Sequence, residues 1–308
     1  MSTVAVFGAS GRQGQAQVRR LVGEGHRPRP VTRTPGLFGD LDVVPADYAD
    51  VDSLIAALDG VDAAFFQPPM DSPPEQTLAH ATNLASAMVT AKLPHLVFSP
   101  TMWLPEAPIG QPLYDLMLGV HDTLAAHGVP MTVLCPTIFM DNWLARFAKP
   151  ALVNEHVYRY PHRPDFFMSP ISLDDMAKFM VAALGRDDLV GRKLRVAGPE
   201  TLNPPRIAEA LSAALGAEIR YEYMTPRAFG EYLYSFMGIA GTGISEDDYG
   251  SFIESYYEFN MTSPQRPFAF DVAETLSVLP VNGLETFREL AARQDWTSLD
   301  DVVGSTTG

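Results

Sequence analysis

The feature that most constrains this chain is a glycine-rich turn between an apolar segment and a helical pattern. Residues 3–7 read as a strand, and Gly8-Ala9-Ser10-Gly11-Arg12-Gln13-Gly14 follows at once. In such a turn the first glycine permits the sharp bend and the second makes room for a phosphate. The third lets the helix pack closely against the strand, so that helix amides face the anion. Because this run lies between a strand and a helix, it predicts dinucleotide binding far more strongly than a glycine run alone.

The first 150 residues alternate short apolar runs with helical patterns, which is typical of a parallel sheet with crossover helices. The predicted strands span residues 3–7, 29–32, 42–44, 61–66, 95–99 and 131–135. The predicted helices span residues 13–24, 51–58, 75–91 and 114–127. We therefore expect an α/β fold in which residues 1–150 form a doubly wound parallel Rossmann sheet that binds the nucleotide.

The second half has a looser pattern and predicts a smaller α+β lobe over residues 151–308, some of whose elements complete the sheet. Helices are expected at residues 171–184, 203–215 and 226–237, and strands at residues 193–197 and 218–224. Residues 238–250 are rich in glycine and acidic side chains. They predict a solvated surface loop or, as the alternative, a mobile acidic loop beside a site.

Charge and cysteine content restrict the partners and the compartment. The 22 Lys and Arg against 37 Asp and Glu give a formal charge of −15, which disfavours nonspecific binding to nucleic acid or to an anionic membrane. Cys135 is the single cysteine, so an internal disulfide is excluded and a reducing compartment is expected. The histidines lack metal-ligand spacing, and neither a signal peptide nor an apolar run of about 18 residues is present. We expect a cytoplasmic protein without a metal.

Basic residues gather at the glycine turn, although the chain as a whole is acidic. Residues 1–33 contain six arginines against one acidic residue, Glu24, which suggests a small polyphosphate ligand. An NAD site would place an acidic residue about 20 positions after the turn, but this chain has Arg33 there. A guanidinium at Arg33 suits a 2′-phosphate, with Arg12 beside it, so NADP(H) is favoured over NAD(H).

Several motifs resemble those of the NmrA-like family of atypical short-chain dehydrogenases/reductases. In the first half they are the glycine turn, Thr32-Arg33, Asp59-Gly60-Val61-Asp62 and Gly128-Val129-Pro130-Met131-Thr132. The second half adds the segments 170–177, 190–193 and 224–226, and the resemblance ends near Tyr234. It implies either an NADPH-dependent reductase of quinones or aromatic ethers, or a redox sensor that reports NADP(H) to a regulatory partner.

The resemblance also implies a set of cofactor contacts. Arg33 would take the 2′-phosphate, Asp47 and Tyr48 would lie near the adenine, and residues 136–139 near the nicotinamide. Gln67, Ser99 and Pro136 follow predicted strands, at whose carboxyl ends ligands bind in such sheets. The candidate cofactor residues are Gly8, Ser10, Gly11, Arg12, Gln13, Gly14, Arg33, Asp47, Tyr48, Gln67, Pro68, Ser99, Pro136, Thr137 and Phe139.

The catalytic residues depart from the pattern of the wider superfamily, in which a Tyr and a Lys one helical turn apart supply the proton. Met117 occupies the position where that lysine is expected, and residues 112–127 contain no Lys or Arg. Tyr114 and His121 share a helical stripe with Met117, so either is a candidate proton donor. The alternative is that both side chains simply pack or face solvent.

Apolar side chains that follow the strand ends predict a pocket for a flat, apolar ligand, although core packing or a homodimer surface would explain many of them. Candidates for its wall, together with one polar residue, are Met70, Thr101, Trp103, Met117, Trp143, Phe166 and Phe167. We favour an NADPH-dependent oxidoreductase acting on an apolar or aromatic carbonyl, quinone or ether. The alternatives are a catalytically silent NADP(H) sensor with a regulatory protein partner, and a lyase or isomerase that uses the cofactor transiently.

Overall fold

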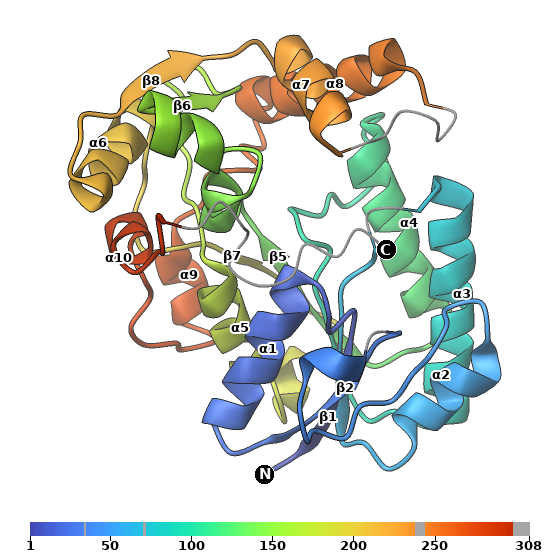
Figure 1. Ribbon diagram of the computed structural model, residues 1–308. Coiled ribbons are helices and arrows are strands. Elements are labelled where there is room, and N and C mark those ends of the chain that lie inside the picture. The colour runs from blue at the N-terminus through green and yellow to red at the C-terminus, as the bar shows by residue number, and fades with distance from the viewer. Residues whose placement is uncertain (34, 70–71, 238–243, 298–308) are drawn as a thin grey trace.

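The computed structural model describes residues 1–33, 35–69, 72–237 and 244–297. Its centre is a parallel six-stranded sheet with the order β2-β1-β3-β4-β5-β7 (Figure 1). The strands are β1 (Thr3–Phe7), β2 (Arg27–Val31), β3 (Ala63–Phe66), β4 (Leu96–Phe98), β5 (Met131–Pro136) and β7 (Lys193–Val196). The predicted α/β Rossmann architecture is confirmed.

Helices cover both faces of this sheet, because successive side chains of each strand point to opposite faces. Ala5, Phe7 and Phe66 pack on the side of α2 (Val51–Leu58), α3 (Pro74–Thr90) and α4 (Pro112–Ala126). Val4, Val6 and Phe65 pack on the side of α1 (Arg12–Gly23) and α5 (Leu173–Ala182). The inner strands β1, β3, β4 and β5 are almost continuously apolar because both of their faces are buried, whereas the edge strands β2 and β7 alternate basic residues with buried ones.

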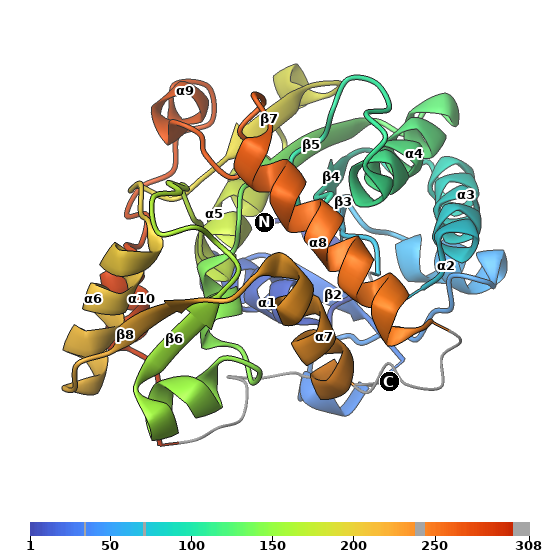
Figure 2. The same cartoon turned by 90° about the horizontal axis from the view of Figure 1, so that it is seen from above.

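The second lobe lies at one end of the sheet, as Figures 1 and 2 show. Its two parallel strands are β6 (Val157–Tyr160) and β8 (Arg220–Tyr223). Its helices are α6 (Pro204–Leu215), α7 (Pro226–Met237), α8 (Glu246–Thr262) and α10 (Phe287–Ala292), while α9 (Val272–Leu276) packs near β7. Short helical turns span η1 (Pro35–Leu37), η2 (Met140–Leu144), η3 (Ala151–Glu155) and η4 (Asp187–Leu189).

Two local predictions were wrong. Residues 42–44 form no strand of the sheet, because Val44 contributes only an isolated bridge to Val31. Glu246, Asp247 and Asp248 belong to the first turn of α8 and not to a loop, since the Ser245 hydroxyl caps that helix by accepting from the Asp248 amide. Acidic residues in a first helical turn are favoured by the helix dipole. Residues 238–243 of that predicted loop lie outside the described residues.

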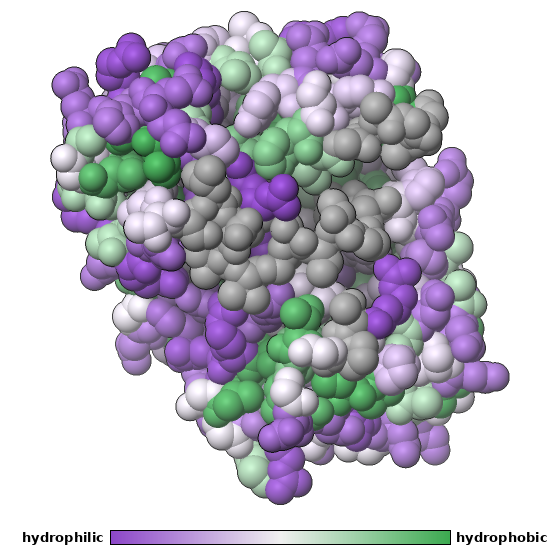
Figure 3. Space-filling view, viewed as in Figure 1, coloured by the Kyte–Doolittle hydropathy of each residue, from purple (hydrophilic) through white to green (hydrophobic). Residues whose placement is uncertain are grey.

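The surface seen in Figure 3 is mainly hydrophilic, with hydrophobic side chains in separate small patches. Among the described residues, no helix combines the length and the apolar character that crossing a membrane requires.

Candidate functional site

The glycine turn is built so that two of its positions exclude a side chain. Gly8 has φ +68°, and its carbonyl accepts a hydrogen bond of 3.0 Å from the Gly11 amide. A Cβ on Gly14 would lie 2.3 Å from the Gly8 carbonyl oxygen and 2.7 Å from the Cα of Ala9. Helix α1 begins at Arg12 with Gly11 as its cap residue, so no side chain caps the first-turn amides. These amides are therefore available to an anion.

A cavity of about 580 Å³ runs along this turn and along the carboxyl ends of the neighbouring strands. Ten of the predicted cofactor residues line it, together with Thr101. These residues are Gly8, Ser10, Gly11, Arg12, Gln13, Arg33, Asp47, Tyr48, Gln67, Pro68 and Thr101. The turn, the basic position after β2 and the aromatic residue Tyr48 thus border one continuous space.

Four other predicted cofactor residues lie deeper or farther along the sheet. Ser99 is fully buried, and its hydroxyl accepts from the Thr101 amide at 3.3 Å. Pro136 ends β5, and the Thr137 hydroxyl donates to the Ser169 carbonyl. Phe139 packs against the core on the α5 side. None of these four lines the cavity along the glycine turn.

Three polar residues of the cavity were missed by the sequence analysis: Ser72, Gln76 and His80. The His80 ring stacks on Tyr48, with ring centroids 5.5 Å apart and an interplanar angle of 28°. Gln76 and His80 lie one turn apart on α3, the helix that follows β3 and Gln67. That spacing of four residues was the available signal, because it places both side chains on one helix face.

Arg12 connects the glycine turn to the segment that leads into the second lobe. Its Nη2 donates a hydrogen bond of 2.7 Å to the Asp141 carbonyl oxygen. The carboxylate of Asp141 accepts from the Leu173 amide at the start of α5, at 2.9 Å. Burial raises the pKa of Asp141, and the nearby Arg12 charge acts in the opposite direction. The second predicted phosphate ligand, Arg33, is exposed at the end of β2.

The structure brings neither candidate proton donor to the cavity lining. Tyr114 is fully buried, and its hydroxyl donates to Asn260 Oδ1 of α8 at 2.6 Å. Burial raises the pKa of Tyr114 well above its ordinary value. His121 lies two turns farther along α4, with Nδ1 2.8 Å from the Asp122 carboxylate, and Met117 is packed in the core.

The predicted pocket wall is divided among several environments. Trp103 meets the Tyr114 ring edge-on at 5.5 Å, whereas Trp143 is fully buried in the second lobe. Phe166 packs against His162, and Phe167 is 41% exposed beside the Arg206 guanidinium. Met70 lies outside the described residues.

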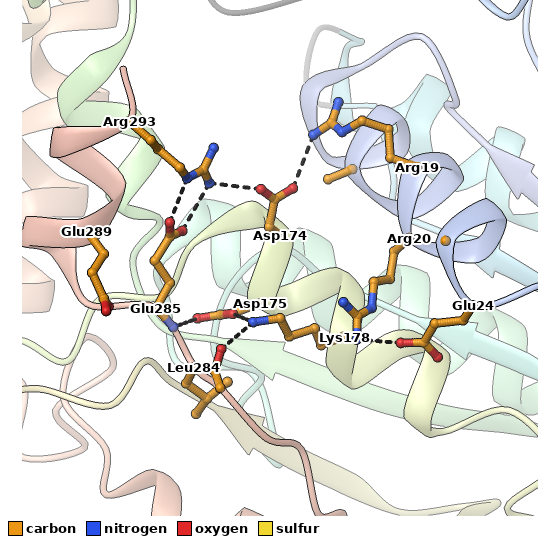
Figure 4. A pocket seen from close by; sticks show the side chains of 13 residues that line it. Arg19, Arg20, Glu24, Asp174, Asp175, Lys178, Leu284, Glu285, Glu289 and Arg293 are labelled. Carbon is orange, nitrogen blue, oxygen red and sulfur yellow. Dashed lines mark hydrogen bonds and ion pairs between the residues drawn. The ribbon is translucent and has the colours of Figure 1, made fainter.

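A second, more open cavity of about 780 Å³ lies between α1, α5 and the segment that leads into α10 (Figure 4). Its charged side chains satisfy one another. Asp174 bridges Arg19 at 3.1 Å and Arg293 at 2.8 Å, and the buried Asp175 accepts from Lys178 at 2.6 Å. This arrangement fixes the C-terminal segment onto α5.

Comparison with known proteins gives a family match and a set of related folds. The model of the NmrA-like family matches residues 1–263. An NAD(P)H azoreductase of Xenophilus azovorans is 29% identical over 231 residues, which are 72% of this chain and 77% of that protein. The (4-alkanoyl-5-oxo-2,5-dihydrofuran-3-yl)methyl phosphate reductase of Streptomyces griseus is 29% identical over 228 residues, covering 71% and 76% of the two chains.

Solved structures with the same fold include two proteins with different roles. An NADPH-dependent quinone oxidoreductase of Escherichia coli, complexed with NADPH, has a TM-score of 0.74 and 19% identity, covering 94% of this chain and 98% of its own. NmrA, a negative transcriptional regulator, has a TM-score of 0.71 and 17% identity, covering 96% and 99%. At these identities the likeness establishes the fold alone.

Proposed function

The chain belongs to the NmrA-like family, and from that membership and its cavity we propose that it is an NADP(H)-dependent oxidoreductase of apolar or aromatic small molecules. The observation that carries the proposal is the glycine turn, in which Gly8 has a positive φ, the backbone around Gly14 leaves no room for a Cβ, and no side chain caps the amides of α1. In this proposal residues 1–150 hold the cofactor, and residues 151–308 contribute the substrate side.

The lining of the cavity fits the parts of a dinucleotide. The first-turn backbone amides of residues 12–14 would bind the pyrophosphate, and the Arg33 guanidinium would bind a 2′-phosphate. The stacked rings of Tyr48 and His80 offer an aromatic wall for the adenine. The bound nicotinamide would supply a hydride, while the residues of this chain orient it and exclude water.

The absence of a lysine beside Tyr114 narrows the substrate class. A quinone or a comparable conjugated acceptor needs little acid assistance, because its reduced anion is already stabilised by delocalisation. The relatives from Xenophilus azovorans and Streptomyces griseus are both named as reductases. We therefore favour a conjugated, electron-accepting substrate over a simple ketone.

The second candidate is a catalytically silent NADP(H) sensor that binds a regulatory protein. Two observations favour it: Met117, at the position expected for the lysine, has no proton to donate, and the Tyr114 hydroxyl is buried and donates to Asn260 instead of facing the cavity. Both candidates require nucleotide binding, so hydride transfer is the property that separates them.

The separating experiment follows the hydride. The purified protein is incubated with a small-molecule extract and NADPH deuterated at C4, each face in turn, and products are searched by mass spectrometry. We expect deuterium in an aromatic or conjugated product from one face only, since a fixed nicotinamide presents one face to the substrate. Absence of label in a preparation shown to bind NADPH would reject the reductase and favour the sensor.

A further inference from the structure

His162 is a fully buried histidine to which the described residues offer no side-chain hydrogen-bond partner. Its exposed fraction is 0%, and neither Nδ1 nor Nε2 has a partner. The Nε1 of Trp143 and the hydroxyl of Tyr158 are also buried and unpartnered. Such groups are rare in folded proteins because burial without a partner weakens the fold. Four unpartnered atoms in one region of the second lobe therefore need an explanation.

These side chains belong to one cluster, which we call the aromatic box: Trp143, Tyr158, Tyr160, His162 and Tyr257. Tyr158 and Tyr160 project from the same face of β6, because strand side chains alternate. The Tyr160 ring lies 5.0 Å from His162 and 6.4 Å from Trp143, measured between centroids. Tyr257 of α8 closes the box, with its ring 5.3 Å from His162.

A row of aromatic rings extends from the aromatic box to Trp103. The ring centroids of Tyr257 and Tyr256 are 5.5 Å apart, and the Tyr256 ring stacks on Tyr114 at a centroid distance of 5.9 Å. The centroids of Tyr114 and Trp103 are 5.5 Å apart. Trp103 is two residues from Thr101, which lines the cavity. Trp103 and Tyr256 are only partly buried. Two members of the row are therefore in part accessible to solvent.

The chemistry of the aromatic box suits an uncharged ligand with an oxygen acceptor. Burial lowers the pKa of His162 to about 3, and no charged side chain contributes to that shift. The imidazole is therefore neutral near pH 7 and has one N–H donor and one acceptor nitrogen. Trp143 adds an N–H donor and Tyr158 an O–H donor, while the surrounding rings favour a flat aromatic surface.

We propose that the aromatic box is the substrate end of the site and binds a flat, uncharged aromatic ring that carries a carbonyl or quinone oxygen, to which His162 donates its N–H. This inference rests on the proposed function and specifies which residues bind its substrate. The rings of the aromatic box contact one another in this structure, so they must separate to admit the ligand. The unpartnered polar atoms are then a cost to the free protein that the bound oxygen removes.

The test compares His162→Phe with the wild type, because phenylalanine keeps an aromatic ring but removes both nitrogens. Binding of 1,4-naphthoquinone and of naphthalene to the NADP⁺-loaded protein is followed by quenching of tryptophan fluorescence. We expect His162→Phe to weaken naphthoquinone binding tenfold or more and to change naphthalene binding less than twofold. The melting temperature of the free variant should stay the same or rise, because an unpartnered group has been removed.

Two further variants make the result decisive. His127→Phe replaces an exposed histidine at the end of α4 and should leave both affinities unchanged. Tyr158→Phe removes one unpartnered hydroxyl without changing the ring, so it should fold normally and weaken naphthoquinone binding by a smaller factor. It decides the question if His162→Phe does not fold.

Four outcomes would overturn the inference. They are no quenching of the wild type by naphthoquinone, equal losses for naphthoquinone and naphthalene, unchanged affinity in both His162→Phe and Tyr158→Phe, or a melting temperature lowered by several degrees with affinities unchanged. The last would indicate that internal water uses the polar atoms. NADPH titration of the wild type separates the two proposals: failure to bind NADPH rejects the proposed function, whereas normal NADPH binding with any of the four outcomes rejects this inference alone.

Discussion

At the scale of single residues, Arg33 carries the expected choice between the two nicotinamide dinucleotides. It is exposed at the end of β2 and lines the same cavity as Asp47 and Tyr48. Arg12, the other arginine expected at the phosphate, instead donates to the Asp141 carbonyl. Among the described residues, Arg33 is therefore the arginine of this cavity whose guanidinium forms no hydrogen bond or ion pair within the chain.

Replacing Arg33 by alanine should therefore affect one dinucleotide selectively. We expect the Kd for NADPH to rise tenfold or more, because a charge-assisted hydrogen bond to phosphate contributes about 1.5–3 kcal/mol. The Kd for NADH should change less than twofold. Fluorescence titration with both nucleotides measures this. Arg27→Ala, at the start of β2, is the matched control. Equal weakening of both nucleotides by Arg33→Ala would contradict the assignment.

At the scale of elements, the segment after residue 263 completes the second lobe although the family model ends there. The Phe287 ring of α10 is fully buried and meets Trp143 edge-on at 5.0 Å. The Glu285 amide donates to the buried Asp175 carboxylate at 2.7 Å, and Thr286 and Glu289 form a capping box at the start of α10. This short helix is therefore held both by burial and by local hydrogen bonds.

Removing the Phe287 ring should cost much of the stability of the fold. We expect Phe287→Ala to lower the free energy of unfolding by about 3–5 kcal/mol, as for other large-to-small core substitutions. Urea unfolding followed by circular dichroism measures the change. Phe167→Ala, at a 41% exposed position, should lower the same free energy by less than about 1 kcal/mol. Similar losses in the two variants would show that α10 is not part of the cooperative core.

At the scale of the whole molecule, buried titratable groups couple stability to pH in opposite directions. The folded pKa of His162 is about 3 against an ordinary value of 6.5, so between these values the unfolded chain binds more protons than the folded one. The contribution of neutral His162 to the free energy of unfolding is fully present above pH 6.5 and is lost as the pH falls toward 3. Burial raises the pKa of Asp141 and Asp175 above the ordinary value of 3.8. Above that pH the folded chain binds more protons than the unfolded one, so the contribution of these two carboxyl groups to the free energy of unfolding falls as the pH rises.

The contribution of His162 can be isolated by comparing two proteins at two pH values. Relative to His162→Phe, the wild type should lose about 2 kcal/mol of unfolding free energy between pH 7.5 and pH 5, since each pKa unit corresponds to about 1.4 kcal/mol. Urea unfolding of both proteins at both pH values gives this difference. The carboxylates cancel in the comparison because both proteins contain them. A difference that does not depend on pH would show that His162 protonates in the folded state.

The sequence determined the elements whose signals are local. The glycine turn was readable because a positive φ at Gly8 and the contact of Gly14 with the Gly8 carbonyl both demand glycine. The inner strands β1, β3, β4 and β5 were readable because burial on both faces makes them almost continuously apolar. The start of α8 was also encoded locally, in the spacing of Ser245 and Asp248, but the acidic composition favoured a loop interpretation.

Only the tertiary structure decided which distant side chains meet. Arg12 finds the Asp141 carbonyl 129 positions away, and the Tyr114 hydroxyl finds Asn260 at a separation of 146. The aromatic box likewise joins η2, β6, the segment after β6 and α8. A helical stripe or a strand pattern fixes the direction of a side chain relative to its own element. It does not fix the partner, because packing between elements far apart in the chain determines which groups become buried together.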